Sequence, residues 1–91
     1  MSKSIVQSDC QCFLCGRETM LERHHILGGP NRRLSERWGI WCYLCHEDHV
    51  GVDGAQYNRE TGDYLKREAQ KAFEELYGHD KWMALFRKNY L

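Results

Sequence analysis

Two closely spaced cysteine pairs constrain the fold of this chain more than any other feature of its sequence. Two residues separate Cys12 from Cys15, and two residues again separate Cys42 from Cys45. Thiolates at this spacing sit on one tight turn and bind the same ion, and two such pairs complete a tetrahedral zinc site. The spacing therefore predicts a structural zinc ion held by these four cysteines.

Disulfide bonds are the other use that a small chain makes of its cysteines. Five cysteines in 91 residues leave one over, and Cys10 is the one outside the two pairs. The first ten residues, MSKSIVQSDC, contain one lysine and no apolar stretch, so they do not resemble a signal peptide. We therefore expect a cytoplasmic protein, whose reducing surroundings favour metal-binding thiols over disulfides.

Chain length and charge set further limits. A domain of this size buries only about 60% of the surface that its unfolded chain exposes, so a bound metal supplies stability that the small core lacks. No apolar run approaches the roughly 18–20 residues that cross a bilayer, and no membrane partner is expected. Basic and acidic residues each number 13, which excludes a strongly basic protein that coats nucleic acid but allows a local basic face.

The order of residue patterns predicts one small α+β domain over residues 10–91, preceded by a flexible lead-in over residues 1–9. Runs of β-forming residues lie in the first half, and apolar residues recur at helical spacing in the second half. The expected elements are a zinc knuckle at 10–16, strands within 20–27 and 38–44, an exposed polar loop at 32–37, a short helix at 45–49, a long helix from Asn58 or Asp63 to Tyr77, and a last helix capped by Asp80.

Four of the five histidines lie between positions 24 and 49, close to the cysteine pairs. His24 and His25 stand between the two pairs, and His46 and His49 follow the second pair. Paired imidazoles beside a metal-organised turn suggest a second metal site, in which one imidazole is a ligand and another is a general base.

The order of these motifs resembles the HNH endonucleases, which have the ββα-metal fold. The resemblance rests on the CxxCG motif at 12–16, the HHI motif at 24–26, the glycine-rich loop after it, and a Leu-Cys pair followed by His49. The longer stretches HHILGGPNRRLSERWGIW and FEELYGHDKWMALFRKNYL are similar to a phage-associated branch of the family, that of the phage recombination-enhancement nucleases. Together these motifs extend over roughly residues 10–91.

The resemblance implies a metal-dependent endonuclease that hydrolyses phosphodiester bonds in DNA, inside a bacterial host cell if the chain is phage-encoded. His24 would bind the catalytic divalent ion, Mg²⁺ or another, and His49 would be its second protein ligand. His25 would be the general base, because a neutral imidazole with a pKa near 6.5 accepts a proton from water at neutral pH. The ion would neutralise charge on the phosphate and stabilise the departing 3′ oxygen.

The chain departs from the family's pattern at three positions. The family commonly has an Asn before the Leu-Cys pair that orients the general base; Ile40 stands near that place, and Asn31 is a candidate substitute. The pattern LCxxCH puts a zinc ligand at position 48, so Asp48 is an alternative to Cys42 as the fourth zinc ligand. Gln56 stands where relatives often have a histidine that completes the catalytic metal shell.

Arginines border the predicted histidine site. Arg23, Arg32, Arg33 and Arg37 are expected to hold DNA phosphates, which gives affinity without reading the base sequence.

The alternative function is a non-catalytic zinc-binding module that binds DNA or a protein partner. It keeps the cysteine site and does without the histidine chemistry, and the missing Asn and the presence of Gln56 favour it. A nuclease needs an exchangeable second divalent ion, whereas such a module needs only the zinc that folds it.

Overall fold

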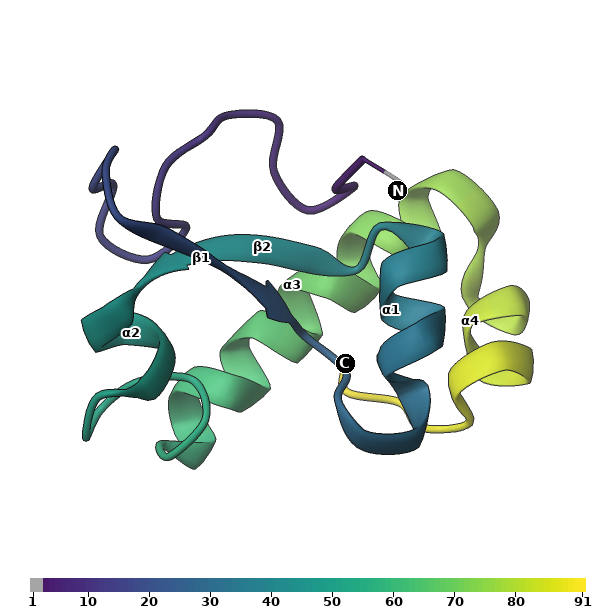
Figure 1. Ribbon diagram of the computed structural model, residues 1–91. Coiled ribbons are helices and arrows are strands. Elements are labelled where there is room, and N and C mark those ends of the chain that lie inside the picture. The colour runs from purple at the N-terminus through teal and green to yellow at the C-terminus, as the bar shows by residue number, and fades with distance from the viewer. Residues whose placement is uncertain (1–2) are drawn as a thin grey trace.

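The computed structural model describes residues 3–91 and has a small α+β fold (Figure 1). Over these residues it contains a two-stranded antiparallel sheet, four α-helices and one 3-10 helix. The predicted α+β class is confirmed at this level. Positions 1 and 2 of the predicted lead-in lie outside the described residues.

The sheet places neighbouring residues of its first strand on opposite faces. Strand β1 (Leu21–His25) pairs with strand β2 (Trp41–Cys45), with His24 opposite Cys42 and His25 opposite Trp41. Because side chains alternate along a strand, Glu22 and His24 share one face with Cys42, whereas His25 shares the other face with Trp41. The two consecutive histidines therefore belong to two different surroundings.

The segment between the strands is helical, which corrects the prediction of an exposed loop at 32–37. A 3-10 helix (η1, Gly29–Asn31) leads directly into helix α1 (Arg32–Trp38), which ends at Gly39 with a φ of 73°. The buried Ser35 hydroxyl donates to the Leu27 carbonyl at 2.7 Å and accepts from the Leu27 N–H at 3.2 Å. These two hydrogen bonds hold α1 against the segment that follows β1. Because this contact is tertiary, no local sequence pattern predicts it.

Gly39 is the residue that lets α1 end and β2 begin. Its left-handed backbone conformation favours glycine, and a Cβ atom there would lie 2.2 Å from the Lys3 carbonyl oxygen. Residues of the predicted lead-in lie alongside β2. The Ile5 N–H donates to the Gly39 carbonyl at 2.9 Å, and the Tyr43 N–H donates to Gln7 Oε1 at 2.6 Å. Residues 3–9 thus contact the sheet, although they form no helix or strand.

The helices after the sheet follow their sequence signals closely. Helix α2 (His46–Val50) follows β2 directly, and helix α3 (Arg59–Tyr77) begins after Asn58, whose side chain accepts from the Thr61 N–H at 3.1 Å. Helix α4 (His79–Phe86) has Gly78 rather than Asp80 before its first residue, so the predicted cap is wrong by two positions. Asp80 instead lies in the first turn of α4, where a carboxylate interacts favourably with the helix dipole.

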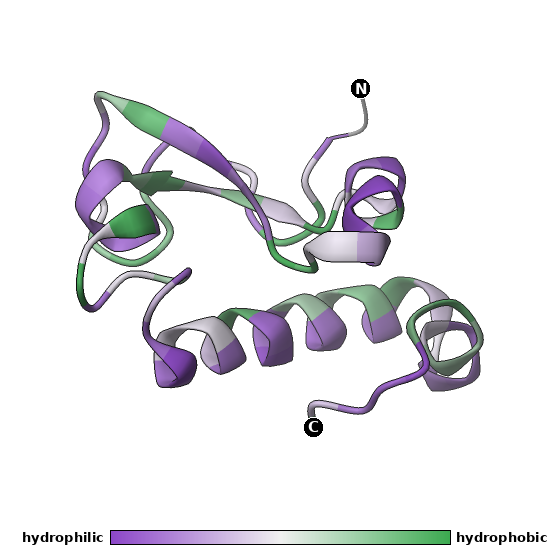
Figure 2. Ribbon diagram, turned by 60° about the horizontal axis from the view of Figure 1, so that its bottom comes forward, coloured by the Kyte–Doolittle hydropathy of each residue, from purple (hydrophilic) through white to green (hydrophobic). Residues whose placement is uncertain are grey.

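The core lies between the sheet and α3, with α4 closing one end. The apolar stripe of α3 faces the sheet and its polar side faces outward (Figure 2). Fully buried side chains from both layers form this core, among them Ile40, Leu44, Leu65, Phe73 and Trp82. No helix within residues 3–91 is both long enough and apolar enough to cross a membrane.

Two candidate metal sites joined by helix α2

The first candidate site is a compact group of three thiols and one carboxylate. One potential ligand atom from each of Cys12, Cys15, Cys45 and Asp48 lies within 4.8 Å of all the others. The thiols of Cys12 and Cys45 lie 3.2 and 3.4 Å from Asp48 Oδ2, and the Sγ atoms of Cys15 and Cys45 are 3.8 Å apart. Four donors of this kind at this separation could hold a metal ion such as zinc.

A tight turn positions the first two thiols. The Gly16 N–H donates to the Cys12 carbonyl at 2.9 Å, and the Cys12 N–H donates to the Arg17 carbonyl at 2.7 Å. Gly16 has a φ of 80°, a conformation that few other residues adopt readily. The predicted knuckle is therefore present around Cys12 and Cys15, and its Phe13 N–H is bonded to the Tyr43 carbonyl of β2 at 2.8 Å.

Cys42 is not a member of this group, which corrects the prediction from spacing alone. It stands three positions before Cys45 along a strand, so the two side chains point to opposite faces of the sheet. Cys42 is fully buried in the core, and this burial raises the pKa of its thiol to about 12. Asp48 supplies the fourth group because α2 turns back toward the knuckle directly after Cys45.

The acid groups of this cluster influence one another strongly. A backbone hydrogen bond with Arg17 favours the thiolate of Cys15, but interactions with Asp48, Cys12, Cys45 and partial burial outweigh it and raise the pKa of Cys15 to about 12. Burial disfavours the carboxylate of Asp48, yet hydrogen bonds from the three thiols prevail and lower its pKa. The Cys15 thiol thus keeps its proton until a cation replaces it, because metal binding requires the thiolate and releases the proton.

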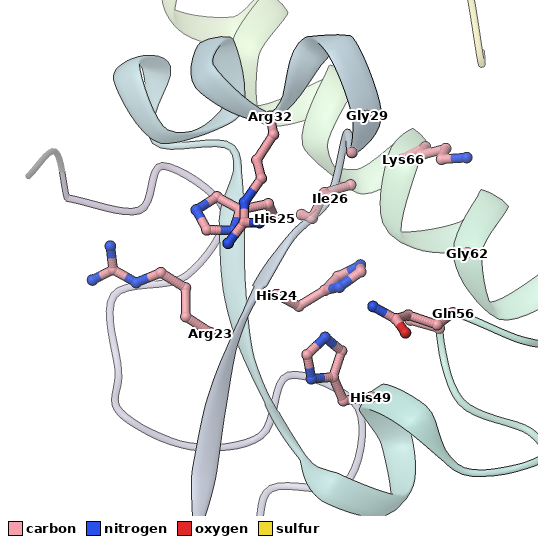
Figure 3. Close-up of a pocket in the computed structure, with 12 residues that line it drawn as sticks. Arg23, His24, His25, Ile26, Gly29, Arg32, His49, Gln56, Gly62 and Lys66 are labelled. Carbon is pink, nitrogen blue, oxygen red and sulfur yellow. The ribbon is translucent and has the colours of Figure 1, made fainter.

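The second candidate site is a hollow of about 370 Å³ beside the end of β1. Its lining includes His24 and His25 from β1, His49 from α2, Gln56 from the following loop and Lys66 from α3. The ring centroids of His24 and His49 lie 5.1 Å apart, with the rings at 70° to each other. Figure 3 shows the side chains of His24, His49 and Gln56 converging on one side of β1, so two imidazoles and an amide share one space.

The loop that contains Gln56 is fixed to α2 by its backbone. The Gln56 N–H donates to the His49 carbonyl at 3.1 Å, and the Ala55 N–H donates to the Asp48 carbonyl at 2.7 Å. A Cβ atom on Gly54 would lie only 2.8 Å from the Glu47 carbonyl oxygen, so a larger residue there would push the loop away. Helix α2 therefore positions Asp48 for the cysteine cluster and both His49 and Gln56 for the hollow.

Glu22 orients His49, a partner that the sequence analysis missed. Its carboxylate lies 2.9 Å from Nδ1 of His49 and 3.0 Å from Nδ1 of His46. These two imidazoles hold the pKa of Glu22 below its usual value, with His46 contributing more. Because Nδ1 of His49 is engaged, Nε2 is the atom available to a metal ion, and a carboxylate behind a ligating imidazole is a common support. The alternation that puts Glu22 on the face of His24 was its only sequence signal.

His24 is kept neutral by its position. Burial is the main cause that lowers its pKa to about 4, and electrostatic interactions with His49, His25 and Lys66 lower it further. A neutral imidazole has the free lone pair that metal coordination requires. At neutral pH His24 is therefore in the form that can bind a metal ion.

His25 lies on the opposite face of β1, in a second hollow of about 740 Å³. Its Nε2 atom is 2.7 Å from Oε2 of Glu36, and Oε1 of Glu36 is 2.8 Å from Nη1 of Arg23. The hydrogen bond with His25 and the charge of Arg23 hold the pKa of Glu36 below its usual value. Sequence analysis proposed Asn31 as a partner of the base, but the carboxylate bonded to His25 is that of Glu36 on α1.

The predicted arginines occupy different positions around these hollows. Arg23 and Arg32 line both hollows, and Arg33 lines the one that contains His25. The guanidinium of Arg23 is also stacked over Trp41, 3.8 Å from the ring centroid. Arg37 is exposed on α1 and lines neither hollow.

Comparison of the chain with protein families, with curated proteins and with solved structures found no match in any of the three.

Proposed function

We propose that this protein is a metal-dependent endonuclease that hydrolyses phosphodiester bonds in DNA. The observation that supports it most is the convergence of His24 and His49 in one hollow, with His25 on the opposite face of the same strand end. A phosphate at the end of β1 would then have a cation on one side and a base on the other. In-line displacement at phosphorus needs this arrangement, because the attacking and leaving oxygens lie on opposite sides.

The donors in the first hollow fit a divalent cation that accepts nitrogen. Imidazole suits first-row transition metals, whereas Mg²⁺ prefers oxygen ligands, so we favour Mn²⁺, Co²⁺, Ni²⁺ or Zn²⁺ over Mg²⁺. His24, His49 and the amide oxygen of Gln56 would hold the ion and leave further positions for phosphate and water. Such an ion acts as a Lewis acid that neutralises charge on the phosphate and on the leaving 3′ oxygen.

The side chains of the second hollow supply the remaining chemistry. His25 would take a proton from the attacking water as its oxygen bonds to phosphorus, while the bond from phosphorus to the 3′ oxygen breaks. The 3′ oxygen would take up a proton from solvent as it leaves, so the products are a 5′-phosphate and a 3′-hydroxyl. Arg32 and Arg33, both exposed beside His25, would hold the flanking phosphates of the strand.

The order of secondary structure also agrees with this proposal. Two antiparallel strands are followed by a helix, with His24 and His25 on the first strand, β1, and His49 on the helix, α2. This is the order that the resemblance to the HNH endonucleases implies. Arginine at the hollows and no net charge overall suit contact with a few phosphates rather than with a long stretch of duplex.

Nicking of supercoiled plasmid tests this function directly. The wild-type protein, saturated with zinc, is expected to convert the plasmid to open circles with added Mn²⁺ or Co²⁺ and not with chelator. His25→Ala should lower the rate by roughly 10²- to 10⁴-fold, the contribution usual for a general base. His79→Ala is the matched control, because His79 is an exposed residue on α4 whose ring is bonded to Glu74.

Failure of the wild-type protein to cut DNA with any of these ions would overturn the proposal. DNA binding that persists without cutting in a gel-shift assay would then identify the non-catalytic zinc-binding module. Cutting that survives in folded His25→Ala would remove His25 from the role of base.

A further inference from the structure

The pairing of His25 with Glu36 defines which ring nitrogen of His25 is basic. Nε2 of His25 and Oε2 of Glu36 are 2.7 Å apart, and both side chains are largely covered, with 16% and 31% of their surfaces exposed. An ionised carboxylate has no proton to donate, so the imidazole must donate from Nε2. When the neutral ring has its proton on Nε2, the lone pair is on Nδ1.

Glu36 is itself held in place from its other side. Its second oxygen receives a hydrogen bond from Arg23 at 2.8 Å, and the guanidinium of Arg23 lies 3.8 Å from the ring centroid of Trp41. Trp41 is the buried residue paired with His25 across the sheet. The four side chains thus join β1, α1 and β2.

The backbone that supports Glu36 is equally well fixed. The neighbouring residue Ser35 is fully buried, and its hydroxyl makes two hydrogen bonds to the backbone of Leu27, two residues beyond His25. The position of Glu36 relative to His25 is therefore determined by α1. Ile40, the residue just before β2, is fully buried in the core.

We propose that Glu36 is a positioning residue that holds His25 in the tautomer with its proton on Nε2, so that Nδ1 is the atom that accepts the proton of the attacking water. This inference deepens the proposed nuclease function and rests on it for the role of Nδ1. The carboxylate also stabilises the imidazolium that forms when Nδ1 takes up the proton. Arg23 keeps the carboxylate oriented and contributes to the site through Glu36 as well as through any phosphate it meets.

The tautomer can be observed without measuring activity. Long-range ¹H–¹⁵N correlation spectra of the zinc-loaded, ¹⁵N-labelled protein at neutral pH should show His25 protonated on Nε2 and unprotonated on Nδ1. Glu36→Ala should convert His25 to a mixture of tautomers while the amide spectrum stays folded. A wild-type ring protonated on Nδ1, or on both nitrogens, would overturn the inference, as would a tautomer that Glu36→Ala leaves unchanged.

A double-mutant cycle tests the same pair through catalysis. Glu36→Ala should lower kcat by roughly 10- to 100-fold, part of what a general base contributes, with little change in KM. The same change in a His25→Ala background should cost nothing further, because residues that act as one unit are not additive. Equal losses in both backgrounds would show that Glu36 supports only the fold. Glu75→Ala, an exposed change on α3, is the matched control.

These two experiments separate the inference from the function on which it rests. A wild-type protein that never cuts DNA defeats the nuclease proposal, and its His25 spectrum still decides whether Glu36 selects the tautomer. A nuclease whose His25 is protonated on Nδ1 keeps the function and defeats the inference.

Discussion

The cysteine cluster and the histidine hollow are neighbours on α2, yet they are built in opposite ways. The cluster brings four protein donors within 4.8 Å of one another, enough to complete a tetrahedral metal site. The hollow surrounds about 370 Å³ with two imidazoles and one amide. Metal sites closed by four protein ligands are structural, and sites with open positions perform chemistry. Under the proposed function, the cluster would contribute stability and the hollow would contribute the chemistry.

Because both regions use α2, the hollow depends on the cluster more than the cluster depends on the hollow. Helix α2 has five residues, far fewer than the 12 or so at which an isolated helix becomes marginally stable. Cys45, which directly precedes α2, and Asp48, its middle residue, both belong to the cluster, and His49 follows Asp48 directly. A metal ion in the cluster therefore fixes His49 in the hollow, whereas an ion in the hollow adds little to the cluster.

Loss of the cluster is expected to have the largest effect. Cys12→Ser should abolish stoichiometric zinc binding and cooperative thermal unfolding, because structural zinc contributes on the order of 10 kcal/mol, comparable to the entire stability of a small domain. Metal content by mass spectrometry and melting by circular dichroism measure the two losses. A variant that retains one zinc ion and melts like the wild type would contradict the structural role of the cluster.

Two further cysteines provide controls for that experiment. Cys10→Ser should retain zinc, because Cys10 is exposed and outside the cluster. Cys42→Ala should also retain zinc while losing about 1 kcal/mol of stability from a small cavity in the core. Loss of zinc from Cys42→Ala would restore the four-cysteine site that the spacing predicted.

A change in the hollow should be large for metal binding and small for folding. His49→Ala removes one of two imidazole ligands, so Mn²⁺ affinity should fall by more than about 100-fold, beyond the 10- to 100-fold effect of an outer-shell group. Zinc content and melting temperature should stay close to those of the wild type. Titration followed by electron paramagnetic resonance measures bound Mn²⁺, with His79→Ala as control. A parallel loss of zinc would show that the two regions are not separable.

Much of the fold could be predicted because its signals are local. The knuckle, both strands and α3 were predicted from turn residues, β-forming runs and apolar spacing that lie within each element. Helix α1 was missed because seven residues with Leu34 and Trp38 as its partly buried apolar pair give a weak helical pattern. Its stability comes from Ser35 and from packing against the rest of the chain.

The site residues that belong to local sequence motifs could be predicted. Those whose role depends on contacts between different helices and strands could not. The histidines and three of the cluster ligands follow from motifs, but the choice of Asp48 over Cys42 depends on where β2 ends and α2 begins. Glu22 and Glu36 meet their histidines only through tertiary structure, since Glu36 is eleven residues from His25. Surface carboxylates are common, and no spacing rule distinguishes these two.

Substitution of Glu22 measures how much the carboxylate behind His49 contributes to metal affinity in the hollow. Glu22→Gln keeps the shape of the side chain but removes the charge that orients His49, so Mn²⁺ affinity should fall by about 10- to 100-fold. The change in folding stability should be small, because 40% of the Glu22 side chain is exposed. Isothermal titration with Mn²⁺ measures the affinity, and Glu75→Gln is the control. An unchanged affinity would mean that His49 needs no support beyond α2.

The ion pair of Glu74 and His79 lies outside both sites. It shows how much an ordinary ion pair contributes to the free energy of unfolding of this protein. Hydrogen bonds from Gln70 and then from His79 lower the pKa of Glu74, so its carboxylate stabilises the fold above the pKa of an unfolded glutamate, about 4.3. That stabilisation is lost as pH falls through the lower folded pKa. Glu74→Gln should therefore lower the free energy of unfolding by less than about 1 kcal/mol near neutral pH, since half of the His79 side chain is exposed.

The pH dependence of the stability loss in Glu74→Gln distinguishes it from the larger stability loss expected when the cluster loses its metal ion. Acid also weakens zinc binding, because thiols regain their protons, so each variant must be compared with the wild type at the same pH and with excess zinc. The difference in melting temperature between the wild type and Glu74→Gln should shrink as pH falls below the pKa of an unfolded glutamate, about 4.3, because Glu74 becomes protonated in both states. A difference that grows toward acid pH would mean that Glu74 is stabilised as the neutral acid.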